Sequence, residues 1–288
     1  MDFLKELSAK QKKINDYLEK AINGEGLLQK EITEAMNYSL LAGGKRIRPV
    51  LMMATCEALG LSEDEILPFA AALEMIHTYS LIHDDLPSMD NDDLRRGRPT
   101  NHVVYGEAMA ILSGDALLNL AFETAISAPF DAEKKLKAVA LMGRASGYLG
   151  MIGGQVVDLE GEERKLSADE LTKMHAMKTG ALIKAATEMG CVLAGEDEGL
   201  LSDYSSNLGL AFQLKDDILD ETSTAEELGK NIGSDVKNEK TTFITLYGIK
   251  ETERMLEDTT EKAVLALQRI ENSEFLKEFA MYLLKRRN

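Results

Sequence analysis

The sequence predicts an all-α protein whose 288 residues form one domain, residues 1–288. Apolar residues recur every three or four positions along most of the chain, as they do in amphipathic helices. Only five prolines are present, whereas the helix formers Ala, Leu, Met, Glu and Lys are abundant. We find no segment with the alternating pattern of a strand, and no linker rich in Gly, Ser or Pro divides the chain.

The first helices are expected before residue 60. Residues 1–22 form an amphipathic helix, and a second helix covers residues 27–41 before a pair of glycines breaks the pattern. Pro49 suits the first turn of a third helix, residues 50–59. This helix is apolar on most sides, so we expect it to be buried.

Capping signals mark the next helices. Ser62 and Glu65 resemble a capping box that begins a helix over residues 63–86, and Pro87 prevents its extension. A polar loop is expected over residues 88–101. Further helices are expected over residues 103–127, 131–147, 167–189 and 197–219, and two more follow a loop over residues 220–240.

Charge and cysteine content limit the function classes. The net charge of −16 argues against nucleic acid, whose phosphates are bound by basic surfaces. Cys56 and Cys191 are too few for a disulfide framework and indicate a reducing compartment. No signal peptide is evident, and no apolar run approaches the roughly 20 residues that a membrane helix needs. The sequence therefore predicts a cytoplasmic protein without a membrane span.

Two acidic clusters stand at the ends of apolar helical runs. The first spans Asp84 to Asp90, and the second contains Asp216, Asp217 and Asp220. Asp216 and Asp220 share a helix face, where like charges destabilise a helix unless a cation compensates. Alone, the second cluster fits a surface as well as a metal site. Together the clusters favour magnesium, which binds carboxylates together with substrate phosphates.

Basic residues are gathered beside the glycine pair, beside the first acidic cluster and in the second half of the chain. They are Lys45, Arg46, Arg48, Arg95, Arg96, Arg98, Lys178, Lys230, Lys237 and Lys240. The basic groups beside the glycine pair and beside the first acidic cluster, together with the two acidic clusters, suggest two anionic ligands held in different ways. One would be bound through metal, and the other directly by Arg and Lys.

The chain resembles the short-chain trans-polyprenyl diphosphate synthases, and within them the bacterial farnesyl diphosphate synthases. The segments that carry the resemblance are Gly43–Pro49, Asp84–Thr100, Gly153–Gln155, Lys178–Gly180, Phe212–Asp220, Gly229–Lys230 and Lys240–Thr241. The first aspartate-rich segment has the longer bacterial form. These segments occur in the family's order from residue 43 to 241, and jointly they are very specific.

The resemblance implies an isoprenoid synthase-type bundle of about ten or more helices around a central cavity, usually as a homodimer. It implies condensation of isopentenyl diphosphate with an allylic diphosphate, and Mg²⁺ as cofactor, with about three ions per site. The implied metal ligands are Asp84, Asp90 and Asp216, supported by Asp85, Asp217 and Asp220. Arg95, Lys178, Lys230 and Lys240 would hold the allylic diphosphate, and Lys45, Arg48, His77 and Arg96 the isopentenyl diphosphate. The Lys178 carbonyl, Thr179 and Gln213 would face the allylic cation.

Product length is indicated by Tyr79 and Ser80. Tyr79 precedes Asp84 by five residues, which is about 7.5 Å along a helix. A bulky ring there would form the floor of the pocket and stop elongation, whereas Ser80 is small. In the family, an aromatic residue at this position combined with the longer aspartate-rich segment accompanies a fifteen-carbon product. Alternatively, Tyr79 is an ordinary core residue.

Other functions remain open. A geranylgeranyl diphosphate synthase would lack the aromatic floor, and a helical protein that only binds metal or a partner would leave the motifs without catalytic use. A terpene cyclase needs no second diphosphate site, so Lys45, Arg48 and Arg96 argue against it. The basic C-terminal residues, 285–287, are expected to be a solvated tail, although tails fold over the second diphosphate in some relatives.

Overall fold

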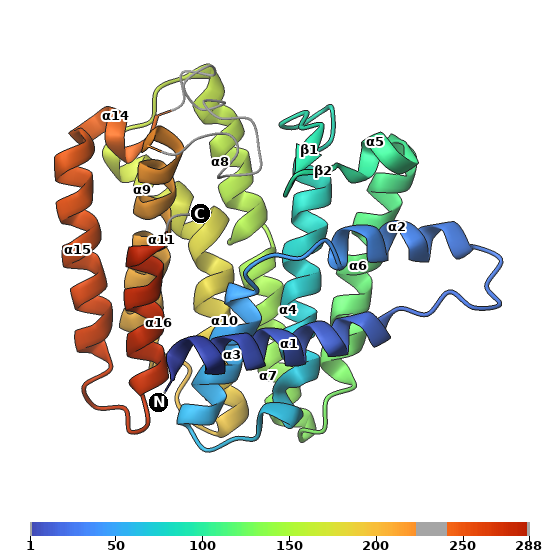
Figure 1. The fold of residues 1–288 in the computed structure, drawn as a ribbon, viewed down its shortest axis with the longest axis horizontal. Coiled ribbons are helices and arrows are strands. Elements are labelled where there is room, and N and C mark those ends of the chain that lie inside the picture. Colours follow the sequence, from blue (N-terminus) through green and yellow to red (C-terminus); the bar gives the residue numbers. More distant parts are fainter. Residues whose placement is uncertain (1, 223–240, 287–288) are drawn as a thin grey trace.

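The computed structural model describes residues 2–222 and 241–286, and its architecture confirms the expected all-α fold (Figure 1). The longer helices are α1 (Phe3–Ala21), α2 (Lys30–Leu40), α3 (Ile47–Ala58), α4 (Glu63–Asp84), α6 (Glu107–Ile126), α7 (Ala132–Ser146), α8 (Met151–Glu163), α9 (Ala168–His175), α10 (Ala181–Ala194), α11 (Ser202–Thr222), α15 (Ile249–Ala266) and α16 (Glu274–Lys285). The shorter ones are α5 (Asn101–Tyr105), the π-helix η1 (Ala176–Gly180) and α14 (Phe243–Tyr247).

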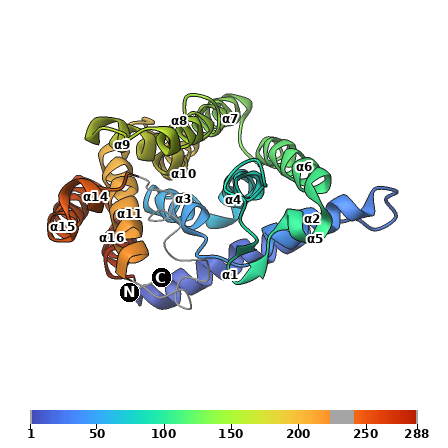
Figure 2. The same ribbon diagram turned by 90° about the horizontal axis from the view of Figure 1, so that it is seen from above.

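Helix α4 is the central element, and it ends at the first acidic cluster. Ser62 and Glu65 form the expected capping box at its start. In Figure 2, α4 lies between α3 and α6, and it also contacts α1, α2 and α10. A helix that is apolar on nearly every side must be covered in this way. This packing holds Asp84, its last residue, in a fixed position.

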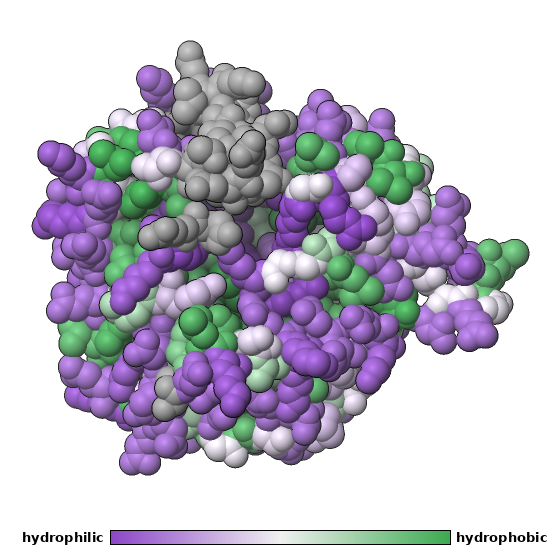
Figure 3. All heavy atoms as spheres, in the orientation of Figure 1, coloured by the Kyte–Doolittle hydropathy of each residue, from purple (hydrophilic) through white to green (hydrophobic). Residues whose placement is uncertain are grey.

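Helices α1 and α2 run across the other helices in Figure 1. Ile14 and Leu18 of α1 are fully buried against them. Lys10 is also buried, and its Nζ lies 2.5 Å from a Glu57 carboxylate oxygen and contacts Glu63. The face of the molecule in Figure 3 is mostly hydrophilic, in keeping with a chain of which 28% is charged.

A short hairpin corrects the expectation of no strand. Strands β1 (Leu94–Arg95) and β2 (Arg98–Pro99) pair antiparallel within the segment expected to be a loop. Arg96 and Gly97 connect them, with φ angles of 55° and 72°. Turns with two such left-handed residues match the twist of adjacent strands and favour Gly. The strands are too short for the alternating pattern to reveal them.

Several helix boundaries also differ from expectation. The helix predicted over residues 103–127 is divided into α5 and α6 by Gly106, whose φ is 83°. The helix predicted over residues 167–189 contains η1. Three helices rather than two follow residue 240, because a glycine with φ of 78° at position 248 separates α14 from α15.

Helix α6 corrects the expectation that no apolar run is long enough to span a membrane. By length and composition, its 20 residues are sufficient. This is weak evidence for a membrane, because a core helix of a soluble protein passes the same test. One side of α6 packs on α4 through small and apolar residues such as Ala110, Leu117 and Ala121, all fully buried.

Candidate active site

A cavity of about 520 Å³ lies beside the C-terminal half of α4. Its polar lining consists of Arg48, His77, Ser80, His83, Asp84, Ser88, Gln155, Lys178 and Thr179. Its apolar and aromatic lining consists of Tyr79, Leu81, Leu86, Met89, Ile111, Met151, Ile152, Val156 and Leu159. The cavity therefore brings together predicted site residues from α3, α4 and η1.

Asp84 is held by two side chains from other helices. Gln155 Nε2 donates to Asp84 Oδ1 over 2.7 Å, and Lys178 Nζ lies 3.9 Å from Asp84 Oδ2. The same ammonium is 2.7 Å from Asp158 Oδ2. Burial lowers the pKa of Lys178, but Asp84, Asp158 and Asp90 outweigh burial and raise it overall. Lys178 therefore stays charged within an acidic setting.

The close approach of α8 and η1 creates this arrangement. A side chain at position 154 would place its Cβ 2.6 Å from the Lys178 Cα, so only glycine fits there. η1 is a π-helix, a single turn of wider hydrogen bonding that often marks a functional site. Thr179 in this turn donates from Oγ1 to Gln213 Oε1 over 3.3 Å. Gln213 in turn donates to Asp217 over 2.9 Å, which links η1 to the second acidic cluster.

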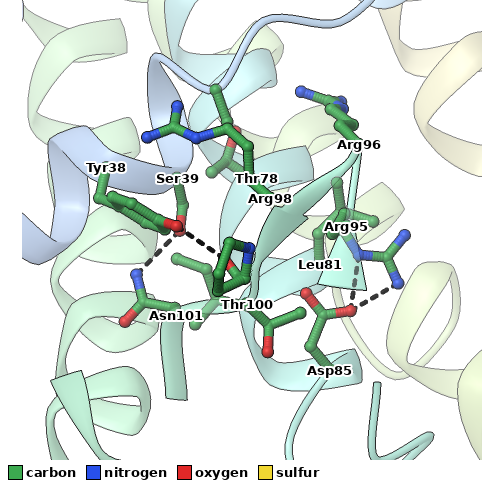
Figure 4. Close-up of a pocket in the computed structure, with 13 residues that line it drawn as sticks. Tyr38, Ser39, Thr78, Leu81, Asp85, Arg95, Arg96, Arg98, Thr100 and Asn101 are labelled. Atoms are coloured by element: carbon green, nitrogen blue, oxygen red, sulfur yellow. Dashed lines mark hydrogen bonds and ion pairs between the residues drawn. The ribbon is translucent and has the colours of Figure 1, made fainter. Parts of the chain in front are cut away.

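Asp85, the residue after α4, faces the hairpin (Figure 4), whereas Asp84 lines the 520 Å³ cavity. Its Oδ1 accepts from Arg95 Nε over 2.6 Å and lies 2.5 Å from Arg95 Nη2. Burial raises the pKa of Asp85 to about 6 despite the neighbouring Arg95. Asp85 therefore fixes the hairpin on α4, and the hairpin carries Arg95 and Arg96.

The contact with Arg96 explains why two glycines precede Lys45. Its guanidinium donates to the Gly43 carbonyl oxygen, and a Cβ at Gly44 would lie 2.6 Å from the Arg96 Cζ. Gly44 also has a φ of 116°, which side chains rarely allow. The break at residues 43–44 therefore holds Arg96 beside the basic segment.

Arg46 and Arg48 have different environments although they are only two positions apart. Arg46 is buried and donates to Glu74 over 2.6 Å, to Asn15 over 2.9 Å and to the Leu40 carbonyl over 2.8 Å. By contrast, the Arg48 Nε is buried without a hydrogen-bond partner in the described part of the chain. Arg46 is thus satisfied by the fold, whereas Arg48 has capacity for a ligand.

Burial and crowded cations depress several pKa values in this region. Burial, Arg48 and Arg96 hold the pKa of His77 well below its ordinary value. Burial lowers the pKa of Lys45 to about 8; nearby Arg286 adds to this effect, and Asp216 opposes it. Burial also lowers the pKa of Arg48. A bound anion would relieve this repulsion.

The expectation of a solvated C-terminal tail is wrong for Arg286, whereas Lys285 is exposed and residue 287 lies outside the described residues. Arg286 is 6% exposed rather than solvated, and its Nη2 lies 2.5 Å from Asp216 Oδ1. The same nitrogen donates to the Phe212 carbonyl over 3.0 Å, and the guanidinium lies 4.1 Å from the Phe212 ring centroid. Basic composition suggested a solvated tail, but a specific carboxylate and an aromatic face bind this arginine.

The other predicted residues are placed as follows. The buried Asp217 accepts from the Phe243 backbone N–H over 2.8 Å, and Asp220 is partly exposed in the last turns of α11. Asp90 is exposed, and its N–H donates to the Asp84 carbonyl over 2.9 Å. Lys230 and Lys240 lie outside the described residues. Tyr79 and Ser80 both line the cavity.

Two contacts of the site were not predicted. Asp158 follows the Gly153–Gln155 segment by one helical turn, so it shares the face that meets η1. That spacing was a signal the sequence offered. Arg286 gave no comparable signal, because its contact with Asp216 joins positions 70 residues apart.

Comparisons with known proteins agree with this geometry. A model of the polyprenyl synthetase family matches residues 29–278. A farnesyl diphosphate synthase from Micrococcus luteus is 46% identical over 262 residues, covering 90% of each chain. A geranylgeranyl diphosphate synthase from Cyanophora paradoxa is 47% identical over 238 residues, covering 81% of this chain and 79% of that protein.

A solved structure also matches along nearly the whole chain. It is a geranyltransferase from Helicobacter pylori complexed with magnesium and isoprenyl diphosphate. The TM-score is 0.87 at 32% sequence identity, and the match covers 99% of this chain and 97% of that one.

Proposed function

Because the chain belongs to the polyprenyl synthetase family, we propose that it condenses isopentenyl diphosphate with dimethylallyl and geranyl diphosphate, giving mainly farnesyl diphosphate. The observation that carries this proposal is the 520 Å³ cavity, where Asp84 and Lys178 share a space with apolar side chains. A cavity with charged groups and an apolar wall suits a diphosphate attached to a hydrocarbon chain.

The acidic clusters fit magnesium as cofactor. Carboxylate oxygens are its preferred protein ligands. Among the described residues, no three carboxylates are close enough together to hold one metal ion. Asp84 and Asp216 instead form ion pairs with Lys178 and Arg286. Asp84, Asp90 and Asp216 would hold about three ions, with Asp85, Asp217 and Asp220 supporting them. Bound magnesium would offset the negative charge that grows on the leaving diphosphate.

The allylic substrate would lie along α4 and η1. Arg95, Lys178, Lys230 and Lys240 would bind its diphosphate through charge-assisted hydrogen bonds. The Lys178 carbonyl, Thr179 and Gln213 would face the allylic cation. The hydrogen bond between Thr179 and Gln213 supports this assignment, because it holds two neutral dipoles together. Neutral groups stabilise a cation without being alkylated by it, as a carboxylate would be.

The second diphosphate would be bound by Lys45, Arg48, His77 and Arg96. The unpartnered Arg48 Nε and the depressed pKa values of this cluster support an anion there. The double bond of isopentenyl diphosphate would then attack the cation, and the departing diphosphate would accept the proton. The apolar wall would exclude water, which would otherwise capture the cation.

The proposal is tested by incubating the chain with labelled isopentenyl and dimethylallyl diphosphates, with and without Mg²⁺, and measuring product length. A Mg²⁺-dependent fifteen-carbon product is expected. A twenty-carbon product would favour the second candidate, a geranylgeranyl diphosphate synthase, the activity for which the Cyanophora paradoxa relative is named. No condensation by folded protein would favour a non-catalytic helical protein that binds metal or a partner.

Tyr79 gives a prediction about product length. It is 5% exposed and lines the cavity, which supports its role as the floor. Replacing Tyr79 with Ala should deepen the cavity, so products of twenty carbons or more should replace most of the fifteen-carbon product. Chromatography of the dephosphorylated products measures this change. An unaltered profile would mean that Tyr79 is only a core residue.

We also infer that the chain acts as a cytoplasmic homodimer. Large apolar side chains are exposed on α5 and α6, including Val103, Val104, Leu112 and Ile126. A second exposed set includes Leu136 on α7 and, in the turn between α7 and α8, Tyr148 and Leu149. Extended apolar surfaces of this kind are typical of subunit interfaces.

A further inference from the structure

Two rings on one face of α4 stand together at the wall of the cavity. Tyr79 and His83 are four residues apart, so their side chains are neighbours on the helix. Their ring centroids are 5.8 Å apart at an interplanar angle of 77°, an edge-to-face arrangement. Both residues line the cavity. The depth of the cavity, which we attribute to Tyr79, therefore depends on the His83 ring as well.

The His83 ring is held by the neighbouring helix α6. Its Nε2 lies 3.1 Å from the Ile111 carbonyl oxygen. A carbonyl oxygen only accepts hydrogen bonds, so Nε2 carries the proton and donates it. Asp115 Oδ1 lies 3.9 Å from the same nitrogen. The His83 side chain is 29% exposed, so the ring is held on one side and open on another.

Gly114 of α6 provides the space for this ring. A Cβ at position 114 would lie 2.5 Å from His83 Cδ2 and 2.9 Å from Cε1, and nearer still to Nε2. The φ of Gly114 is not in the left-handed region, so space rather than backbone conformation explains the glycine. Glycine within a helix is less favourable than alanine, so its presence here needs a reason. Ile111, Gly114 and Asp115 thus form a notch on one face of α6 that receives His83.

We propose that His83, seated in the Gly114 notch, is a residue that determines product length. This inference rests on the proposed condensation. The notch draws the His83 ring toward α6, and the ring supports Tyr79 edge to face at the depth where elongation stops. A methyl group in the notch would displace the ring toward Tyr79 and the cavity. Loss of the ring would leave Tyr79 without its support and open the cavity along α6.

Two substitutions should change product length in opposite directions. Gly114→Ala should shorten the cavity, and the ratio of ten-carbon to fifteen-carbon product should rise about tenfold, the discrimination that one methylene gives in an apolar pocket. His83→Ala should raise the twenty-carbon fraction by a similar factor. The double variant should match His83→Ala, because the added methyl group no longer meets a ring.

Gly143→Ala is the matched control. Gly143 is also within a helix, but its added Cβ would be 3.8 Å from the nearest atoms, which belong to Phe122. This variant should keep the product profile of the unmodified chain. Thermal unfolding of each variant separates loss of folding from altered length. If Gly114→Ala fails to fold, His83→Ala, which only removes atoms, decides the question.

The outcomes for the two proposals are distinct. No condensation by the unmodified chain would overturn the proposed function and this inference with it. Condensation with the same product length in His83→Ala and in Gly114→Ala would overturn the inference alone. A double variant that behaves as the sum of the single ones would also overturn it, because the notch and the ring would then act separately.

Discussion

His175 illustrates how burial changes the chemistry of a single side chain. Its ring stacks on Phe243 with centroids 5.5 Å apart, and Nε2 is buried without a partner among the residues described. Burial lowers the pKa of His175 from 6.5 to about 4. Between these pH values the unfolded chain binds a proton that the folded chain excludes. The free energy of unfolding therefore falls as the pH drops from 6.5 to 4.

Replacing His175 with Phe should remove this pH dependence while keeping the stacked ring. From pH 7 to pH 5 the unmodified chain should lose about 2 kcal/mol more unfolding free energy than the variant. Denaturant unfolding at both pH values measures the difference. Some acid sensitivity should remain in the variant, because His77 has a depressed pKa as well. An identical loss in both proteins would show that His175 titrates normally.

Residue types alone did not separate structural from ligand-binding arginines. Arg46 and Arg48 belong to one basic segment, yet Arg46 is bound by Glu74 and Arg48 lines the cavity. Arg46 is the N-cap of α3 and has a left-handed conformation with φ of 52°, which local sequence does not indicate. The aspartate clusters were easier to identify, because like charges on one helix face destabilise the helix unless a cation compensates.

At the scale of elements, α16 ends beside the second acidic cluster. Arg286, the residue after α16, neutralises Asp216 at 2.5 Å and is buried there. If Asp216 binds magnesium, as proposed, the guanidinium and the metal compete for the same carboxylate. A hydrogen bond to a charged group contributes about 1.5–3 kcal/mol, so the competition should be measurable.

Replacing Arg286 with Gln should therefore increase the apparent affinity for Mg²⁺ about tenfold in the absence of substrates. The rise in melting temperature with Mg²⁺ concentration measures this affinity without catalysis. Arg254→Gln on α15, whose partner Glu251 is exposed, is the matched control and should leave the Mg²⁺ response unchanged. Equal responses in both variants would show that Arg286 does not oppose metal binding.

Elements were predictable where a capping signal marked them. Ser62 and Ser167 begin helices with the expected capping boxes, and Asp131 caps α7. Periodicity did not predict η1, because a single wider turn changes the spacing of apolar residues less than that spacing varies among ordinary helices. It also did not predict the break at Gly106, since the apolar spacing resumes after it.

At the scale of the whole molecule, exposed apolar side chains of α6 and α8 border the cavity. Ile111, Ile152 and Val156 line the cavity and are 45%, 45% and 51% exposed. A cavity that protects a cation from water should not be bounded by exposed side chains, so a second copy would complete its outer wall. Sequence patterns could not predict this arrangement, because it depends on α6 and α8, which are far apart in the sequence, both lining the cavity.

This arrangement predicts that the chain forms a dimer and that one charged substitution in the interface disrupts it. Leu112 is 52% exposed on α6 and does not line the cavity. Leu112→Glu would bury an unpaired charge in the expected interface, which costs several kcal/mol and should raise the dimer dissociation constant about 100-fold or more. Leu265→Glu on α15, 49% exposed at a site away from that face, should leave the dimer intact. Sedimentation velocity measures both. If the unmodified chain is monomeric, or if both variants dissociate the dimer equally, the exposed apolar side chains do not form a specific interface.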